Sequence, residues 1–283
     1  MLWRGRKGSS NVDDRRGFST GGIVTGGGVV GILIYLLNVY LGGDPTHLPP
    51  ALTQQSQTTK LTEAEQAADD TMAQFVSVVL AETEHVWSEI FNKHYKEYNK
   101  PTRVLFRNRV ESGCGFAGAA SGPFYCPGDQ KLYIDLSFYS DLRNRFQATG
   151  DFAMAYVIAH EVGHHVQNLL GLSEKMNQLR QQVGEKEYNK YSVRVELQAD
   201  YYAGVWAHHA DTKSHLVEQG DIQEALNAAS AVGDDNIQKK MQGEVVPDAF
   251  THGTSAQRMD WFQRGYKSGN LEDGNTFEEQ LVN

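Results

Sequence analysis

Two histidines and a glutamate near the middle of the chain have the spacing of a metal-binding motif. His160 and His164 are four residues apart, and Glu161 directly follows the first of them. On a helix, residues four apart project from one face, so both imidazoles reach the same ion. Glu161 is then better placed to contact a metal-bound water than the metal. This H-E-x-x-H pattern predicts a zinc ion with a general base beside it.

The surrounding residues favour a buried helix at this position. The run 153–170 is apolar on nearly every side, and Gly171 follows it as a stop signal. Titratable side chains in a buried helix cost free energy unless they are paired or bind a metal, which favours zinc over two structural histidines. His165 points about 100° away from His164 on a helix, so we expect a hydrogen-bonded wall residue there.

A catalytic zinc takes three protein ligands and keeps one position open. Glu196 is the candidate third ligand because it lies in a largely apolar helical stretch over 193–209. Asp200 shares its face one turn later and is predicted to accept the outer ring N–H of a ligand histidine. Glu185, Glu187, His208 and His209 are the alternative third ligands. The expected cofactor is one Zn²⁺ per chain.

This set of residues predicts hydrolysis of a peptide bond. Zinc lowers the pKa of a bound water to about 7, so Glu161 can take its proton and later pass one to the leaving amine. The oxyanion of the tetrahedral intermediate needs a further donor. His252, in the glycine-containing loop 251–254, is the candidate, with Arg258 to brace it. Tyr201 and Tyr202 are the alternatives, and a plain surface role for His252 stays open.

Length and composition predict one large domain with appendages. The chain has 283 residues and a net charge of −9, which argues against nucleic acid as a partner. The domain is expected over 62–283, with a long amphipathic helix that begins at the capping box of Thr62 and Glu65. Strand patterns follow over 102–110 and 131–136. The predicted fold class is α+β, mainly helical, with a small sheet.

Residues 1–61 predict attachment to a membrane. Residues 1–21 read as a basic cytoplasmic tail, and 22–42 are apolar over a length that crosses a bilayer as one helix. Residues 43–61 are a polar tether, and no cleavage site marks the apolar stretch as a signal peptide. Small-residue pairs in the span suggest a homodimer. The expected location is the bacterial inner membrane, with the domain on the periplasmic side.

Two local features have open alternatives. Cys114 and Cys126 are expected to form a disulfide in an oxidising compartment, and the alternative is a pair of reduced thiols in the cytoplasm. The strand over 131–136 either offers a free edge to an extended peptide or lies in the interior of the sheet.

The two motifs, His160-Glu-Val-Gly-His164 and Glu196-Leu-Gln-Ala-Asp200, resemble those of the gluzincin-type metallopeptidases, in which the later glutamate is the third zinc ligand. The whole chain is similar to the bacterial family of "putative neutral zinc metallopeptidases". Further matching stretches are residues 3–6, 11–16, 122–127, 133–136 and 251–258. The resemblance implies a membrane-anchored zinc peptidase with a zincin-like fold, but no particular substrate. Gly253 stands where related gluzincins have proline after the histidine.

Three functions are consistent with these observations. The leading hypothesis is a membrane-anchored zinc endopeptidase that acts on peptides or unfolded proteins of the cell envelope. The alternative is a zinc-stabilised scaffold or chaperone that binds extended chains without cutting them. A third is a zinc hydrolase for a non-protein amide such as a wall peptide.

Overall fold

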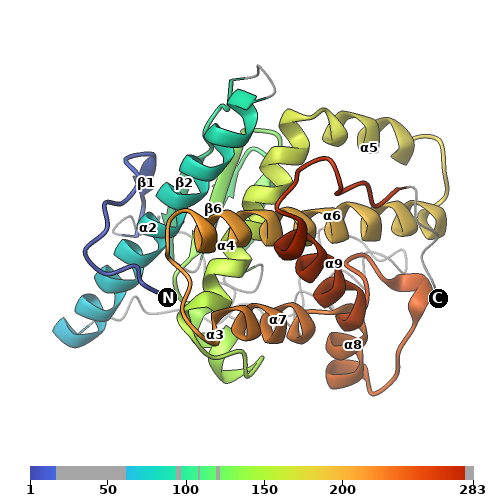
Figure 1. Cartoon of the computed structure of the whole chain (residues 1–283). Coiled ribbons are helices and arrows are strands. Elements are labelled where there is room, and N and C mark those ends of the chain that lie inside the picture. The colour runs from blue at the N-terminus through green and yellow to red at the C-terminus, as the bar shows by residue number, and fades with distance from the viewer. Residues whose placement is uncertain (17–61, 94–96, 108, 119–121, 278–283) are drawn as a thin grey trace.

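A computed structural model describes residues 1–16, 62–93, 97–107, 109–118 and 122–277 (Figure 1). Over these residues the fold is α+β and mainly helical, as predicted. The predicted span 22–42, its small-residue pairs and the tether 43–61 lie outside the described residues. Within the described ranges, no helix has both the length and the apolar character needed to cross a bilayer.

The elements follow one another along the chain from the first strand to the last helix. They are β1 (Val12–Asp14), α2 (Glu63–Lys93), β2 (Thr102–Phe106), β3 (Arg109–Ser112), β4 (Gly115–Gly118), β5 (Phe124–Cys126), β6 (Lys131–Asp135), α3 (Phe138–Asn144), α4 (Asp151–Leu169), α5 (Leu172–Arg180), α6 (Glu185–Thr212), α7 (Asp221–Ala231), α8 (Asp234–Gln242), the short 3-10 helix η3 (Pro247–Ala249) and α9 (Ser255–Ser268).

Helix α4 lies at the centre of the domain, with α2 and the sheet on one side of it and α6 and α9 on the other (Figure 1). Its side chains from Phe152 to Ala159 are all buried in one hydrophobic core. The helix ends at Leu169 because Gly171 adopts a left-handed conformation (φ +83°), which glycine tolerates without steric cost. The apolar run that carries the histidines is therefore the central, buried helix that the sequence predicts.

Glycines let α6 approach both of its neighbours at backbone distance. A Cβ atom on Gly163 of α4 would lie 2.9 Å from the carbonyl oxygen of Ala199, and one on Gly265 of α9 would lie 2.0 Å from that of Tyr201. Because real side chains do not fit at these distances, both positions require glycine. The close packing of α4 on α6 brings the two predicted metal motifs together.

The main sheet has the strand order β1-β2-β6-β5. Strand β6 pairs with β2 in parallel and with β5 in antiparallel orientation, so it lies in the interior of the sheet. The alternative in which residues 131–136 offer a free edge is therefore wrong, and β1 and β5 are the two edge strands of this sheet among the described residues. The disulfide between Cys114 and Cys126 is present and joins the β3–β4 turn to the end of β5, with Cα atoms 5.8 Å apart.

Helix α2 begins as predicted and is the second long helix of the core. The Thr62 hydroxyl accepts the backbone N–H of Glu65 (3.3 Å), and the Glu65 carboxylate accepts that of Thr62 (2.7 Å), which completes the capping box. One face of the helix, including Phe75, Val79 and Trp87, is buried against the core.

Residues 1–16 are part of the folded domain, although the sequence predicts a separate tail over 1–21. Strand β1 pairs with β2 in parallel, and Trp3 is buried in the main hydrophobic core. The basic residues of the segment make specific ion pairs, such as Arg6 with Glu82 (2.9 Å) and Arg16 with Asp69 (2.9 Å). Counting charges cannot reveal these pairs because the partners lie more than fifty residues away in sequence.

Candidate metal centre

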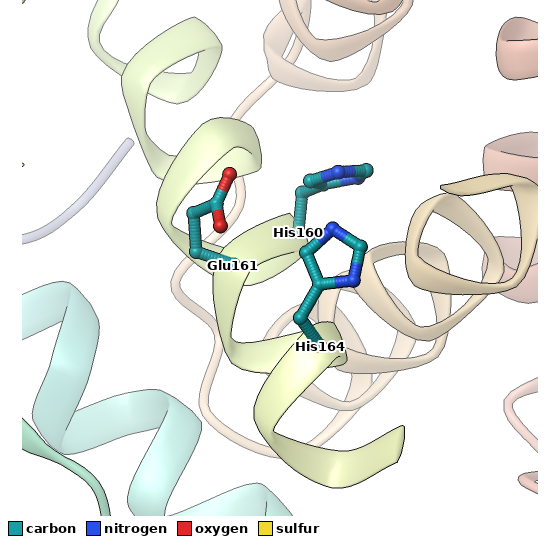
Figure 2. Close-up of side chains that lie close together, drawn as sticks. All are labelled: His160, Glu161 and His164. Atoms are coloured by element: carbon teal, nitrogen blue, oxygen red, sulfur yellow. The ribbon is translucent and has the colours of Figure 1, made fainter. Parts of the chain in front are cut away.

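Three predicted ligands meet where α4 faces α6. The Nε2 atom of His160 lies 3.2 Å from Oε2 of Glu196, and Nε2 of His164 lies 3.4 Å from Oε1 of the same carboxylate. Figure 2 shows the two imidazoles on one face of α4, with Glu161 on the adjoining flank. The regular geometry of α4 explains why His160 and His164 adjoin, and the packing of α6 supplies Glu196.

The distances between these donor atoms fit a tetrahedral zinc ion. Two ligand atoms that each lie about 2.0–2.1 Å from zinc at a tetrahedral angle are about 3.3–3.4 Å apart. The distances of 3.2 Å to Oε2 and 3.4 Å to Oε1 are close to that edge length, with each imidazole facing a different oxygen of the Glu196 carboxylate. Two nitrogens and one carboxylate are also a donor set that zinc takes in hydrolases. His160, His164 and Glu196 therefore suit the ion chemically as well as geometrically.

The outer nitrogens of both imidazoles have acceptors. Nδ1 of His160 lies 2.8 Å from the carboxylate of Asp200, and Nδ1 of His164 lies 2.9 Å from the amide oxygen of Gln167. Because these partners accept hydrogen bonds, each Nδ1 carries a proton, and each Nε2 would present its lone pair to a bound metal. The sequence analysis missed Gln167. Its position three residues after His164, on the same helix face, could have indicated this contact.

Asp200 is the centre of a buried polar network. Its carboxylate, with no exposed area, accepts hydrogen bonds from Arg258 (2.8 and 3.0 Å) and from the hydroxyl of Tyr156 (2.5 Å). Burial by itself would raise the pKa of Asp200, but the charges of Arg258 and His160 outweigh it and lower the pKa to about 2. Asp200 is therefore ionised and holds His160 in place.

Arg258 serves Asp200 and not His252. The guanidinium is buried and also donates to the carbonyl oxygen of Val232 (3.2 Å). The sequence-based idea that Arg258 braces His252 is therefore wrong. The prediction failed because His252 lies in a loop and Arg258 lies six residues later in a helix. This separation in sequence does not determine the direction of the Arg258 side chain.

Glu161 borders the metal position beside the two histidines. Its ligand atom lies within 4.8 Å of those of His160 and His164, and its Oε2 accepts the backbone N–H of Tyr125 (2.8 Å). Glu196 contacts both Nε2 atoms, which favours it over Glu161 as the candidate third ligand. Burial raises the pKa of Glu161 above its ordinary value, which suits a group that takes and returns protons.

His252 lies beside the site in a loop that Asp234 holds. One oxygen of Asp234 accepts the backbone N–H groups of Thr251, His252 and Gly253 (2.7, 2.6 and 3.0 Å), and the other lies 3.2 Å from Nδ1 of His252. The imidazole is half exposed. Asp234, which begins α8, was missed by the sequence analysis because nothing in its sequence context links it to a loop eighteen residues later.

The loop of His252 packs over the turn of α6 that carries Glu196. A Cβ atom on Gly253 would lie 3.2 Å from Val193 and 3.3 Å from Leu197, which are on either side of Glu196 in sequence. Desolvation lowers the pKa of His252, but the negative charges of Glu196 and Asp234 outweigh it and hold that pKa above its ordinary value. The surrounding charges thus favour the protonated imidazole of His252 at the rim of the site.

The remaining candidates lie elsewhere. The Tyr201 hydroxyl donates to the carbonyl oxygen of Asn270 (2.7 Å), and the Tyr202 ring packs on Trp87. The alternative third ligands are exposed near the start of α6 (Glu185, Glu187) or bonded to carbonyl oxygens near its end (His208, His209).

His165 is a buried wall residue, as expected. Its Nδ1 lies 3.1 Å from the Tyr125 hydroxyl and its Nε2 lies 2.6 Å from the Asn99 carbonyl oxygen.

The site has the arrangement of the H-E-x-x-H class of zinc sites, in which two histidines on one helix and a glutamate on a second surround the metal position. Residues 1–277 match the family described as "Putative neutral zinc metallopeptidase", and the chain belongs to this family.

Its relatives include the uncharacterized protein YpfJ of Escherichia coli K12, which is 47% identical over 99% of this chain and the whole of YpfJ. The uncharacterized proteins Mb2605 of Mycobacterium bovis and Rv2575 of Mycobacterium tuberculosis are each 44% identical over 64% of this chain and 63% of their own length. No solved structure is significantly similar to the chain.

Proposed function

We propose that this protein is a zinc-dependent endopeptidase with a zincin-like domain that cuts extended or unfolded polypeptide chains. The observation that carries the proposal is the set of donor distances, 3.2 and 3.4 Å, between Glu196 and the Nε2 atoms of His160 and His164. These three residues would hold zinc. When bound, the ion would polarise the scissile carbonyl and activate water, which is the chemistry that zinc supplies in hydrolases.

Glu161 moves the proton in this proposal. Its Oε2 is held by the N–H of Tyr125, which fixes the carboxylate beside the metal position. The carboxylate takes a proton from the attacking water and passes it to the nitrogen of the leaving amine. Burial raises the pKa of Glu161, which makes its protonated form easier to reach during the reaction.

His252 is the proposed donor to the oxygen of the tetrahedral intermediate. Its position over the Glu196 turn, and the carboxylate of Asp234 on Nδ1, leave Nε2 to donate toward the site. Asp234 orients the ring through its three backbone hydrogen bonds to the loop. A donor of this kind stabilises charge that develops only in the transition state.

The orientation of β5 favours an extended peptide as the substrate. The backbone N–H of Tyr125 points away from β6 and toward Glu161, so the open edge of the sheet faces the site. A peptide that adds to this edge as a strand would run past Glu161, with main-chain hydrogen bonds that do not depend on its sequence.

The test compares the full-length protein with Glu161→Gln on an unfolded, casein-like substrate, with products read by mass spectrometry. We expect one zinc per chain in both proteins and at least about a 10²-fold loss of cleavage in the variant. Glu187→Gln, at the exposed start of α6, is the matched control and should keep full activity.

Other outcomes of the same test point to the other functions. Undiminished cleavage by zinc-loaded Glu161→Gln would overturn the mechanism. If neither protein cuts the substrate but both prevent its aggregation, the zinc-stabilised scaffold or chaperone is the function. Cleavage confined to a non-protein amide such as a wall peptide would establish the third hypothesis.

We also propose that the domain works on the extracytoplasmic side of the bacterial inner membrane, attached through residues 22–42. The disulfide between Cys114 and Cys126 supports this location because disulfides persist in oxidising compartments. Alkylation and mass measurement of protein from cell envelopes should find no free thiol before reduction and two after it. The small-residue pairs in 22–42 are the basis for proposing a homodimer, which a mass measurement in detergent tests.

A further inference from the structure

Residues 1–16 pack against a long stretch of the surface of the domain. The Trp3 ring packs edge-on against Phe75 of α2 at 5.4 Å between centroids, and its indole N–H donates to Asp151 at the start of α4 (2.9 Å). Trp3 is only 6% exposed. A large aromatic side chain buried to this extent is a strong anchor, because its removal from a core is strongly destabilising.

Polar contacts continue along the rest of the segment. The guanidinium of Arg6 pairs with Glu82 of α2 and donates to the carbonyl oxygen of Ser214 (2.7 Å) after α6. Ser9 and Asn11 both donate to the carboxylate of Glu84, at 2.6 and 3.2 Å. Glu84 is itself buried, so these bonds belong to the interior and not to a solvated surface.

Strand β1 completes the main sheet. It lies beside β2 in parallel register, from Val12 opposite Arg103 to Asp14 opposite Leu105. The Asn11 carbonyl oxygen accepts the N–H of Arg103 (3.0 Å), and the Leu105 carbonyl oxygen accepts the N–H of Arg15 (2.8 Å). Without the segment, β2 would become an exposed edge of a three-stranded sheet.

We infer that residues 1–16 and residues 62–277 lie on the same side of the membrane. A single crossing by 22–42 would separate the two parts by the hydrocarbon core, about 30 Å thick, and would break every contact described above. These contacts are incompatible with a single crossing that leaves the basic segment cytoplasmic and the domain periplasmic, so an attachment through 22–42 has to keep both parts on one side. This inference does not depend on peptidase activity.

Two cysteine variants test the inference in the full-length protein. Lys7→Cys places a thiol in the N-terminal segment and Lys175→Cys places one on α5, and both lysines are exposed. Spheroplasts are treated with a membrane-impermeant maleimide before and after detergent, and the unmodified chain reports any reaction of Cys114 and Cys126. We expect the maleimide either to label both variants or to label neither of them before detergent is added.

The pattern of labelling decides between the arrangements. Labelling of both variants in intact spheroplasts supports the inference with the domain outside. Protection of both until detergent is added supports it with the domain inside, and contradicts only the proposed location. Labelling of one variant and protection of the other would overturn it.

A charge swap tests whether the segment is docked in solution. Arg6→Glu and Glu82→Arg should each lower the midpoint of thermal unfolding of the detergent-purified chain, by about 2–4 °C for each kcal/mol lost. The double variant should recover part of this loss because the ion pair is restored with reversed polarity. Single variants without any effect, and a double variant without recovery, would show that the segment does not bind the domain.

Discussion

Helix α4 has a cluster of ionisable side chains at its beginning and another in its second half. At its beginning, Asp151 lies with Asp221 and Glu224 of α7, and their oxygens are within 4.8 Å of one another. In the second half, His160, Glu161 and His164 form a cluster of the same dimensions. Both have the spacing for a cation, so distance alone does not distinguish them.

The two clusters differ in the chemistry of their donors. At the first, carboxylates contact the α-ammonium group of Met1 (2.9 and 3.3 Å) and the indole N–H of Trp3, and burial raises the pKa of Asp221 and Glu224. At the second, burial also opposes ionisation, but imidazole charges hold the pKa of Glu196 well below its usual range. The comparison teaches that imidazole nitrogens with acceptors on their outer atoms distinguish the candidate zinc site, because zinc prefers such ligands.

The largest effect should come from removing a ligand. His160→Ala takes away one of three donors, so we expect loss of the stoichiometric zinc and of all measurable cleavage. Asp221→Asn in the other cluster is the matched control and should retain one zinc per chain. Metal analysis of both purified variants checks this. If the Asp221→Asn variant loses zinc and the His160→Ala variant keeps it, the assignment of the two clusters is reversed.

Removing the proposed oxyanion donor should have the next largest effect. His252→Ala is expected to lower kcat by about 10²–10³-fold with zinc content unchanged, because the imidazole acts on the transition state and not on the metal. Asp234→Asn should give a smaller fall in kcat, since the loop loses its anchor but keeps the ring. A fall in zinc content in either variant would show that the loop serves the metal instead.

Loss of an outer contact to a ligand should weaken metal binding. Gln167→Ala removes the acceptor on Nδ1 of His164, and we expect the affinity for zinc to drop by about 10–100-fold. Competition with a chelator measures this affinity. Gln178→Ala, on the exposed face of α5, is the control with no expected change, and equal affinities for both variants would remove Gln167 from the site.

A substitution of Gly163 tests how closely α4 and α6 pack. Gly163→Ala forces α4 and α6 apart, because the added Cβ meets the backbone of Ala199, and should cost about 1–3 kcal/mol of stability together with zinc affinity. Gly184→Ala, before α6, meets nothing within 4 Å and should be tolerated. Denaturant unfolding gives the stabilities, and a fully stable Gly163→Ala would contradict the packing.

The smallest effect is expected in the acidic cluster at the start of α4. Burial raises the pKa of Glu224, so its ionisation costs the folded state stability as pH rises from the ordinary carboxyl value through the raised pKa. Glu224→Gln should therefore be as stable as the wild type near pH 4 and equal or more stable at pH 7, with zinc unchanged. Thermal unfolding at both pH values measures this. A variant that is less stable than the wild type at pH 7 alone would show that ionised Glu224 stabilises the folded state.

Local patterns predicted the main helices well, and failed where a side chain chooses between distant partners. The period of α4 places His160 and His164 on one face whatever the rest of the chain does. The capping box at Thr62 is equally local. By contrast, Arg258 could not be assigned to Asp200 in advance, and Asp234 could not be linked to His252, because both contacts depend on how helices pack.

By itself, the sequence determined the helix that carries two imidazoles and a glutamate, since a spacing of four residues and an apolar run are properties of a few consecutive residues. Tertiary structure alone decided the rest of the site: the glycine-mediated contact that brings Glu196 against the imidazoles, the strand edge at Tyr125, and the docking of residues 1–16. Such contacts join residues that are distant along the chain, and their energies come from burial and pairing that exist only after the chain has folded.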